Sequence, residues 1–456
     1  MAYYAWKSYK LKVDPLRIFE ILKNERNCFF LDSSLSSNSS GRYSFLGIDP
    51  FYVLNTKNEE PFNNLRELLN GYKISADKSN IPFLGGAVGY LSYDLGFLLE
   101  KKLRRKTRED LGVPDCFLAF YNTVIAIDNT KREFYIFAAG FPEKKYSFSK
   151  TLCKTNIKKI EKLLSGLKPY KSGIKKDKQN FKASPLQSNF NKKDYISAVI
   201  KAKRYIKKGD IYQVNLSQRF ETKTQLSASE IYRRLHQLTP SDFSAYFDAG
   251  DFEILSSSPE RFLKLEGNTV ITSPMKGTRS RGRTGKEDAA LKKELINSKK
   301  DKAELTMIVD LERNDLGRVC KYGTIKVNSL RQLEEYNTVF QTTATVSGQL
   351  HNDKDRIDLL RACFPGGSIT GCPKIRAMEI IEELEPNRRN LYTGCLGYLS
   401  FSGGMDFNIL IRTILKKQDK VYFGVGGGIV ADSEPESEYQ ETLVKAKAMI
   451  EAIGNQ

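Results

Sequence analysis

The sequence contains few of the residues on which several common kinds of active site depend. Among its 456 residues there are only two histidines, His236 and His351, and one tryptophan. Neither histidine lies near a cysteine or carboxylate cluster with the spacing of metal ligands. This argues against a zinc site, a Cys–His glutaminase and a Ser–His triad. Acid–base chemistry would therefore fall to Glu, Asp, Lys or Tyr side chains.

Disulfides and membrane segments are not indicated either. The seven cysteines form no Cys-x-x-Cys pair, which is typical of reduced thiols in a cytoplasmic protein. No apolar run approaches the ~20 residues that a membrane-spanning helix requires, and the N-terminal stretch MAYYAWKSYKLKVDP lacks the apolar region of a signal peptide. The length predicts two or more lobes or one large interwoven domain.

The net charge of +19 is concentrated in one segment. Residues 144–182 contain 13 lysines and two acidic residues, which accounts for +11 and leaves +8 for the rest of the chain. Aromatic residues are sparse among these lysines, so the segment is interpreted as a solvated helix followed by a linker, not as a nucleic-acid site. The predicted organisation is a β-rich lobe at 1–140, this helix and linker at 141–190, and a catalytic domain at 191–456.

A predicted hairpin carries an acid and an amine. The runs ERFLKL and TVITSP flank the turn residues Gly267 and Asn268, a hairpin pattern. Glu260 lies at the start of one arm, and Lys276 follows the other. An uncharged amine could attack carbon while a carboxylic acid protonates the leaving group. A surface hairpin with an ordinary Glu and Lys would have the same sequence, so this pattern alone leaves both readings open.

Several other segments have features of an anion-binding pocket. In IYQVNLSQRF, Gln213, Asn215 and Ser217 share one face, which lines a pocket or lies exposed. Arg412 is expected in a strand of Ile, Leu and Thr residues, where its guanidinium needs an anion such as a substrate carboxylate. The loop FPGGSITG can cradle an anion with backbone N–H groups, and KVYFGVGGGIV ends in glycines that let a ligand approach the backbone.

Three glutamates are candidate metal ligands. Glu304 shares the apolar face of a predicted helix, so it either meets a cation or lies at the edge with its carboxylate in solvent. Glu438, Glu441 and Lys445 share one face of the C-terminal helix. Such a face is usually solvated, but together with Glu304 it offers the oxygen ligands that Mg²⁺ accepts.

Taken together, these segments resemble the chorismate-utilising enzymes, which include anthranilate synthase component I, aminodeoxychorismate synthase component I, and the isochorismate and salicylate synthases. The motifs, in the family's order, are GDIYQVNLSQRF, SSSPERF, SPMKGTRSRGR, KDKAELTMIVDLERNDLGRV, FPGGSITGCPKIRAMEII, YTGCLGY, NILIRT and VGGGIVADSEPESEYQET, and GRYSFLG matches in the N-terminal lobe. The resemblance implies an α+β fold in which two antiparallel sheets pack roughly orthogonally, with helices outside.

Two positions distinguish the branches of this family. By the resemblance, position 276 is alanine in anthranilate and isochorismate-type enzymes and lysine in aminodeoxychorismate synthases, whereas position 213 is lysine in water-using members and glutamine in ammonia-using ones. Lys276 and Gln213 therefore imply aminodeoxychorismate synthase component I, which forms 4-amino-4-deoxychorismate for p-aminobenzoate and folate synthesis. A separate glutamine amidotransferase would supply the ammonia. The alternatives are anthranilate synthase component I and a non-enzymatic basic protein that binds anions or nucleic acid.

The resemblance also implies roles for individual residues. Lys276 would attack C2 of chorismate while Glu260 protonates the departing C4 hydroxyl, and ammonia would then add at C4 and expel the lysine. Mg²⁺ would be held by Glu304 and Glu441, with Glu438 binding directly or through water. The residues that would contact or orient the substrate are Gln213, Thr278, Thr370, Tyr392, Arg412, Gly426, Gly427, Gly428 and Lys445.

Some matches and departures concern regulation and acid–base chemistry. The tryptophan site of relatives matches Ser33, Tyr43, Ser44, Asp242, Phe243 and Ser244, and whether tryptophan binds here as an inhibitor, as a structural ligand or not at all is left open by the sequence. Gln341 stands where members often have histidine, so no imidazole is available there. Cys372 replaces the usual alanine of TGAPK, a change expected to affect packing alone.

Overall fold

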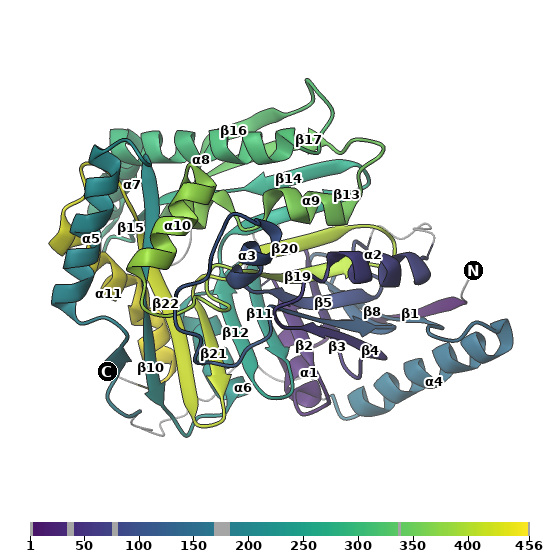
Figure 1. The fold of residues 1–456 in the computed structure, drawn as a ribbon. Coiled ribbons are helices and arrows are strands. Elements are labelled where there is room, and N and C mark those ends of the chain that lie inside the picture. Colours follow the sequence, from purple (N-terminus) through teal and green to yellow (C-terminus); the bar gives the residue numbers. More distant parts are fainter. Residues whose placement is uncertain (1–2, 34–40, 75–80, 168–182, 336–338, 455–456) are drawn as a thin grey trace.

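Two antiparallel β-sheets form the centre of the molecule (Figure 1). The structure is a computed structural model, and it describes residues 3–33, 41–74, 81–167, 183–335 and 339–454. Helices lie outside the two sheets (Figure 1). The predicted α+β class with two antiparallel sheets is confirmed.

The larger sheet has 12 strands within the described residues. Its spatial order is β1 (Tyr4–Lys10), β8 (Glu133–Ala139), β7 (Thr123–Asp128), β3 (Tyr43–Gly47), β2 (Phe29–Asp32), β11 (Phe243–Asp248), β12 (Glu253–Ser258), β21 (Thr413–Lys417), β22 (Lys420–Ile429), β10 (Gln213–Lys223) and β18 (Gly371–Cys372), with β9 (Gln187–Ser188) paired to β10.

The smaller sheet has 10 strands within the same described ranges. Its order is β15 (Met275–Ser280), β17 (Val339–Gln349), β14 (Thr269–Ser273), β13 (Arg261–Glu266), β20 (Met405–Ile409), β19 (Cys395–Ser400), β5 (Gly86–Leu91), β6 (Cys116–Tyr121) and β4 (Tyr52–Thr56), with β16 (Lys326–Glu335) paired to β17. Both sheets join N-terminal to C-terminal strands, since β2 pairs with β11 and β5 with β19. The division into 1–140, 141–190 and 191–456 stays a prediction.

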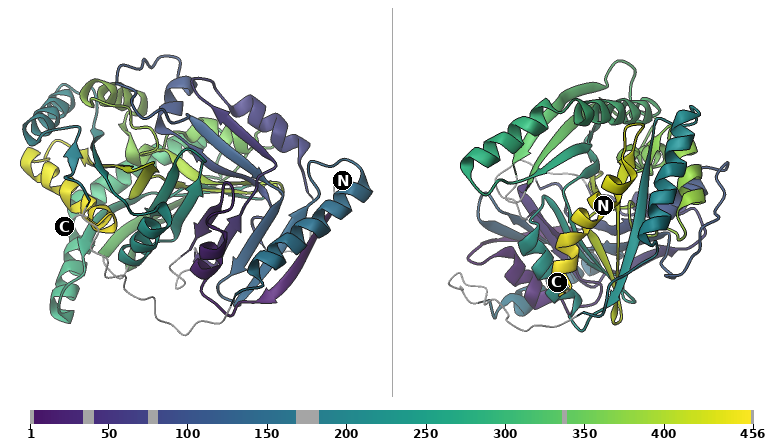
Figure 2. Two further views of the ribbon diagram at one scale, coloured as in Figure 1. Left: turned by 90° about the horizontal axis from the view of Figure 1, so that it is seen from below. Right: turned by 90° about the vertical axis from the view of Figure 1, so that its left-hand side faces the viewer.

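The helices cover the outer faces of these sheets. α8 packs on β16 and β17, α10 on β10, and α11 on β22, while β1 and α11 lie at opposite ends of the molecule (Figures 1 and 2). The helices are α1 (Pro15–Leu22), α2 (Phe62–Gly71), α3 (Gly96–Leu99), α4 (Tyr146–Leu164), α5 (Lys192–Lys207), α6 (Ala228–Leu238), α7 (Gly285–Asn297), α8 (Lys299–Gly317), α9 (Arg356–Cys363), α10 (Lys374–Leu384) and α11 (Pro435–Ala452), with short 3₁₀ turns η2 (Tyr93–Leu95) and η3 (Gly367–Ile369).

The lysine-rich helix of the sequence prediction is α4. Cys153, Ile157, Ile160 and Leu164 recur at helical spacing and are buried against β1 and β8, so the lysines lie on the outer face. The expected linker at residues 168–182 lies outside the described residues. None of the helices in the described part of the chain is long and apolar enough to cross a lipid bilayer.

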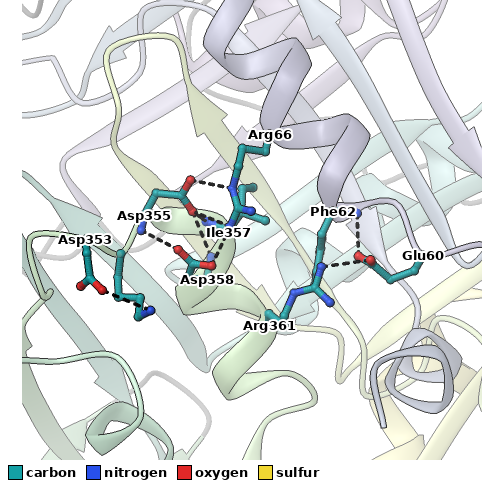
Figure 3. A network of polar contacts seen from close by, with 9 residues as sticks. Glu60, Phe62, Arg66, Asp353, Asp355, Ile357, Asp358 and Arg361 are labelled. Atoms are coloured by element: carbon teal, nitrogen blue, oxygen red, sulfur yellow. Dashed lines mark hydrogen bonds and ion pairs between the residues drawn. The ribbon is translucent and has the colours of Figure 1, made fainter. Parts of the chain in front are cut away.

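A polar network fastens the N-terminal helix α2 to α9 (Figure 3). Arg66 Nε lies 2.8 Å from Asp355 Oδ2, and its Nη2 lies 2.6 Å from Asp358 Oδ1. Asp355 also caps α9, and Arg361 in that helix reaches back to Glu60 at 3.0 Å. These contacts connect residues about 300 positions apart, so they join an N-terminal helix to a helix from the C-terminal half of the chain.

The chain changes sheets between β20 and β21, at the residue Arg412. The single strand predicted for DFNILIRTILKK is wrong, because β20 belongs to the smaller sheet and β21 to the larger one. Arg412 has a φ of 49°, a conformation unusual for a residue with a side chain. Both halves of the segment are buried, so its apolar pattern does not reveal the break. Half-buried Arg412 thereby lies at the junction of the two sheets.

Candidate active site

Lys276 and Glu260 meet at a single serine. β13 and β14 pair as the predicted hairpin, Glu260 directly precedes β13, and Lys276 lies in β15 just after β14. Ser368 in η3 contacts both groups: its Oγ donates to Glu260 Oε1 at 2.6 Å, and its carbonyl accepts from Lys276 Nζ at 3.1 Å. The hairpin and a loop about 100 positions away therefore assemble an amine and an acid side by side.

Burial shifts both groups toward their uncharged forms. Glu260 is 4% exposed, and burial raises the pKa of its carboxyl group although Ser368 and Lys276 oppose the shift. Burial lowers the pKa of Lys276 despite the opposing effects of Glu304 and Glu260. For Lys276, burial therefore outweighs the two neighbouring carboxylates. A neutral amine beside a protonated carboxylic acid can act as nucleophile and general acid.

The three candidate metal ligands come from two helices. Burial raises the pKa of Glu304 on α8 and of Glu438 on α11. Glu438 accepts a hydrogen bond from Ser433 Oγ at 2.6 Å. Burial acts in the same direction on Glu441, but Lys445, at 2.7 Å, together with Lys300 and Lys276 outweighs burial and lowers its pKa. Glu304 and Glu438 each also feel the charge of Glu441, so the carboxylates repel one another.

The donor chemistry of these glutamates fits Mg²⁺. A Cβ at Gly427 would lie 3.2 Å from Glu438 Oε2 and 3.3 Å from Glu441 Oε1, so bare backbone of β22 faces both oxygens. Carboxylate oxygens are the ligands that Mg²⁺ accepts, usually together with water. In the described residues, however, no three or more His, Cys, Asp or Glu side chains are arranged as a metal site, and lysines pair with Glu304 and Glu441. A Mg²⁺ site at the three glutamates stays a prediction.

The polar row of β10 is buried, and its members differ in their hydrogen bonding. Asn215 donates to a backbone carbonyl at 3.1 Å, and Ser217 donates to Glu385 at 2.9 Å. Gln213 is fully buried, and neither polar atom of its amide has a partner among the described residues. A Cβ at Gly428 would lie 2.8 Å from Gln213 Nε2. A buried amide without a partner calls for an explanation, and contact with a ligand or a water molecule is one that fits the glycine strand beside it.

Two of the other predicted substrate contacts shape the floor of this site. Lys445 Nζ donates to the carbonyl of Gly426 at 2.9 Å, which fixes α11 on β22. The ring of Tyr392 lies against β22, because a Cβ at Gly424 would be 2.4 Å from it. Burial raises the pKa of Tyr392, so its phenol stays protonated. Lys445, Tyr392 and Gln213 therefore all lie against β22.

Two of the predicted substrate-binding residues, Thr370 and Thr278, form side-chain hydrogen bonds within the protein. The hydroxyl of Thr370 donates to the carbonyls of Gly366 and Gly367 at 3.0 and 3.2 Å, so it stabilises the loop. Thr278 is exposed, and its hydroxyl accepts from Gln341 Nε2 at 3.2 Å. The Oε1 atom of Gln341 is buried without a partner in the described structure.

Comparison with known proteins identifies the family. The profile of the family described as "chorismate binding enzyme" matches residues 26–451.

The chain belongs to the chorismate binding enzyme family.

Two similar curated proteins carry different activities in their names. Anthranilate synthase component 1 of Acetivibrio thermocellus is 38% identical over 459 residues, which cover 96% of this chain and 92% of that protein. Aminodeoxychorismate synthase component 1 of Bacillus subtilis (strain 168) is 36% identical, with 96% and 94% covered. The crystal structure of anthranilate synthase component I from Streptococcus pneumoniae TIGR4 matches with a TM-score of 0.78 and 30% identity, covering 91% of this chain and 93% of that one. These similarities do not separate the two activities.

A buried ion pair of this chorismate binding enzyme escaped the sequence reasoning. Arg389 Nη2 and Glu385 Oε1 lie 2.7 Å apart, and their side chains are 2% and 4% exposed. Arg389 also donates to the carbonyls of Ile369 at 2.9 Å and Asn215 at 2.6 Å. It thereby ties β10 to the loop that carries Ser368. The only sequence signal was the Glu-x-x-x-Arg spacing, which is common on solvated helices.

Ser368 and Glu312 were also missed. Ser368 belongs to the loop FPGGSITG, which the sequence marked as an anion cradle without assigning a role to its serine. Glu312 lies two turns after Glu304 on the same side of α8 and is 2% exposed. The sequence signal for Glu312 was its spacing, because it follows Glu304 by eight residues in a row that is otherwise apolar.

The predicted tryptophan-site residues surround a second cavity, of about 740 Å³. Five of the six line it, namely Ser33, Tyr43, Asp242, Phe243 and Ser244. The sixth, Ser44, lies behind them, and its hydroxyl donates to Asp32 Oδ1 at 3.1 Å. Asp32 lines the cavity and its Oδ2 lies 2.8 Å from Nε2 of His236. The sequence match thus corresponds to one cavity, while tryptophan as its ligand stays a prediction.

Proposed function

We propose that this chorismate binding enzyme is an aminodeoxychorismate synthase component I, which converts chorismate and ammonia to 4-amino-4-deoxychorismate for p-aminobenzoate and folate synthesis. The observation that carries the proposal is the meeting of Lys276 and Glu260 at Ser368, where burial favours the free amine and the protonated acid. Anthranilate-type members have alanine at position 276 by the family resemblance, so they lack this amine.

In the proposed reaction, the lone pair of Lys276 Nζ bonds to C2 of the ring and the diene electrons shift toward C4. The C4–O bond breaks, and the hydroxyl leaves as water with the proton of Glu260. Ammonia then bonds to C4, the electrons shift back, and the C2–N bond breaks to release the lysine amine. The ammonia nitrogen loses one proton and Glu260 regains one, so the protein is restored.

The remaining residues would bind the dianionic substrate. Arg412 and Lys445 supply positive charge, Gln213 an unpaired amide, and residues 426–428 a bare strand that a ring can approach. When bound to Glu304, Glu438 and Glu441, Mg²⁺ would neutralise the ring carboxylate and draw electron density from the diene.

A separate glutamine amidotransferase is the proposed source of ammonia. The similar proteins are named as component 1, which accords with a second subunit. The purified chain should therefore use ammonium salts slowly, and it should use glutamine only after an amidotransferase subunit is added. Glutamine-dependent turnover by the chain alone would contradict this partnership.

Anthranilate synthase component I is the second candidate, because relatives with that name are equally similar. The two are separated by incubating the chain with chorismate, Mg²⁺ and ammonium and analysing the products by fluorescence and mass spectrometry. An aminated product that retains the enolpyruvyl group supports the proposal. Fluorescent anthranilate with release of pyruvate would support the alternative. Failure of any chorismate turnover would favour the non-enzymatic alternative.

The metal proposal is tested at the glutamates. Glu304→Gln or Glu441→Gln should lower Mg²⁺-dependent activity by about 100-fold or more, because each change removes a charged ligand of the metal, with partial recovery at high Mg²⁺. Glu436→Gln is the matched control, since Glu436 also lies on α11 but pairs with Lys192 in solvent at 56% exposure. Equal, small effects of all three changes would remove the glutamates from this role.

Tryptophan is the ligand proposed for the second cavity. Isothermal titration of the chain with L-tryptophan would measure binding, and chorismate turnover with and without tryptophan would distinguish an inhibitor from a structural ligand. Ser244→Tyr, which fills the cavity wall, should abolish any binding observed. No heat of binding at millimolar tryptophan would contradict the proposal.

A further inference from the structure

A buried carboxyl group on α8 supports the loop that joins the amine and the acid. Glu312 is 2% exposed, and its Oε1 accepts a hydrogen bond from the backbone N–H of Gly367 at 3.1 Å. Its other oxygen, Oε2, has no hydrogen-bond partner among the described residues. The proposed reaction assigns no role to this group, although its burial carries a cost that a fold does not usually retain without a purpose.

The loop lies directly on α8. Gly367 is the first residue of η3, and a Cβ there would lie 2.7 Å from Leu311 Cδ2 and 3.1 Å from Glu312 Oε1. The next residue is Ser368, which binds both Glu260 and Lys276. One hydrogen bond and one peptide unit therefore separate Glu312 from the serine that sets the relative position of the two reacting groups.

We propose that Glu312 is a positioning residue: its carboxyl group holds Gly367, and through it Ser368, so that Lys276 and Glu260 are kept at the geometry of the reaction. This proposal rests on the proposed function only in assigning the acid and amine their roles. Any activity that uses Glu260 as an acid on chorismate would require the same support.

The charged groups around Glu312 favour the protonated form of its carboxyl group. The groups that face it are Asp315 on its own helix, Lys374 on α10, Cys363 on α9 and Glu260. Lys374 pairs with Asp315 and donates to the carbonyl of Cys363, so no lysine or arginine of the described residues forms an ion pair with Glu312. Burial raises the pKa of Glu312 to about 8, with Asp315 and Glu260 acting in the same direction and Lys374 against them.

Ionisation of Glu312 should therefore oppose catalysis. Glu260 becomes negative as it gives its proton to the leaving hydroxyl. A charged Glu312 would repel that developing charge, whereas a neutral Glu312 would not. The chorismate-consuming activity should then fall as pH rises through the pKa of Glu312, in addition to any effect of other groups.

Two substitutions separate support of the loop from titration. Glu312→Leu removes the acceptor for Gly367 and should lower kcat at least tenfold with little change in the KM for chorismate. Glu312→Gln keeps an acceptor oxygen but cannot ionise, so its kcat should lose the decline near pH 8 that the unmodified chain shows. Glu382→Leu and Glu382→Gln are matched controls, since buried Glu382 accepts from the backbone N–H of Thr107 at 2.6 Å, away from Ser368.

The readout is chorismate consumption between pH 6 and 9.5, with unfolding of each variant followed by circular dichroism. An unchanged alkaline decline in Glu312→Gln overturns the proposal, as does a kcat in Glu312→Leu that matches its Glu382 control. If Glu312→Leu does not fold, the pH profile of Glu312→Gln decides. The assay is independent of the product: a chain that makes anthranilate would refute the proposed function and still test Glu312.

Discussion

Lys276→Ala is the substitution that tests the proposed chemistry most directly. It deletes the amine that donates to the Ser368 carbonyl and lies close to Glu260 and Glu304. Without a nucleophile for C2, amination at C4 should slow by at least about 100-fold, equivalent to about 2.7 kcal/mol in the activation barrier. The protonated form of Lys276 lowers the pKa of both Glu260 and Glu304, so the substitution should also raise those two pKa values.

The fold should tolerate the change. The Lys276 amine is enclosed, and burial already disfavours its charged form, so alanine removes an unfavourable burial as well as a hydrogen bond. Lys300→Ala is the matched control: Lys300 Nζ lies 3.9 Å from Glu304, but its side chain is 55% exposed. The control should keep most of the activity, because a solvated ion pair contributes little.

In the assay, each chain is incubated with chorismate, ammonium and Mg²⁺, and the products are measured by liquid chromatography with mass detection. A second measurement omits ammonium and looks in the intact-protein mass spectrum for chorismate minus water bound to the chain. The adduct should form on the unmodified chain and be absent from Lys276→Ala. Because no lysine occupies C2 of the ring in this variant, ammonia can add there, and some anthranilate is expected. Undiminished C4 amination in Lys276→Ala would refute the covalent role, while family membership would stand.

Three further predictions follow from single contacts. Gly428→Ala should displace the Gln213 amide, 2.8 Å from the new Cβ, and lower kcat/KM about tenfold, the loss of roughly one hydrogen bond; normal activity would exclude Gln213 from substrate binding. Arg389→Ala leaves Glu385 buried without its partner and should lower the free energy of unfolding in urea by about 3–5 kcal/mol, so a loss below 1 kcal/mol would contradict the buried pair. Burial lowers the pKa of His236 in the folded chain, but Asp32 raises it by more. The pair therefore stabilises the fold fully below the unfolded pKa of the histidine, and this stabilisation is lost as pH rises through the folded pKa. His236→Gln should remove the corresponding dependence of the free energy of unfolding on pH between pH 5.5 and 8.

Local patterns in the sequence were enough to predict several of the helices and strands and the candidate site residues that lie on them. The hairpin of β13 and β14, the helices α5, α8 and α11, and the glycine strand β22 follow from periodicity, turn residues and glycine runs. Those signals are local because each depends on residues within two or three turns of one another. The ordered motifs also brought the family resemblance, and with it the α+β sheets.

Residues far apart in the sequence required the tertiary structure. Arg412 was expected inside a strand because the apolar run around it is continuous, and the change of sheet behind that run depends on two different pairing partners. The contacts of Ser368 with Glu260 and Lys276, and of Arg389 with Asn215, join segments 92 to 174 positions apart.

By itself, then, the sequence predicted which acids, amine and amides form the candidate site, and on which elements they lie. The tertiary structure decided that the amine and the acid share Ser368, that the Gln213 amide has no partner in the part of the chain that the structure describes, and that Glu312 lies buried behind the loop. It also decided the direction of the Lys276 pKa shift, because desolvation depends on everything packed around a group and not on its neighbours in the chain.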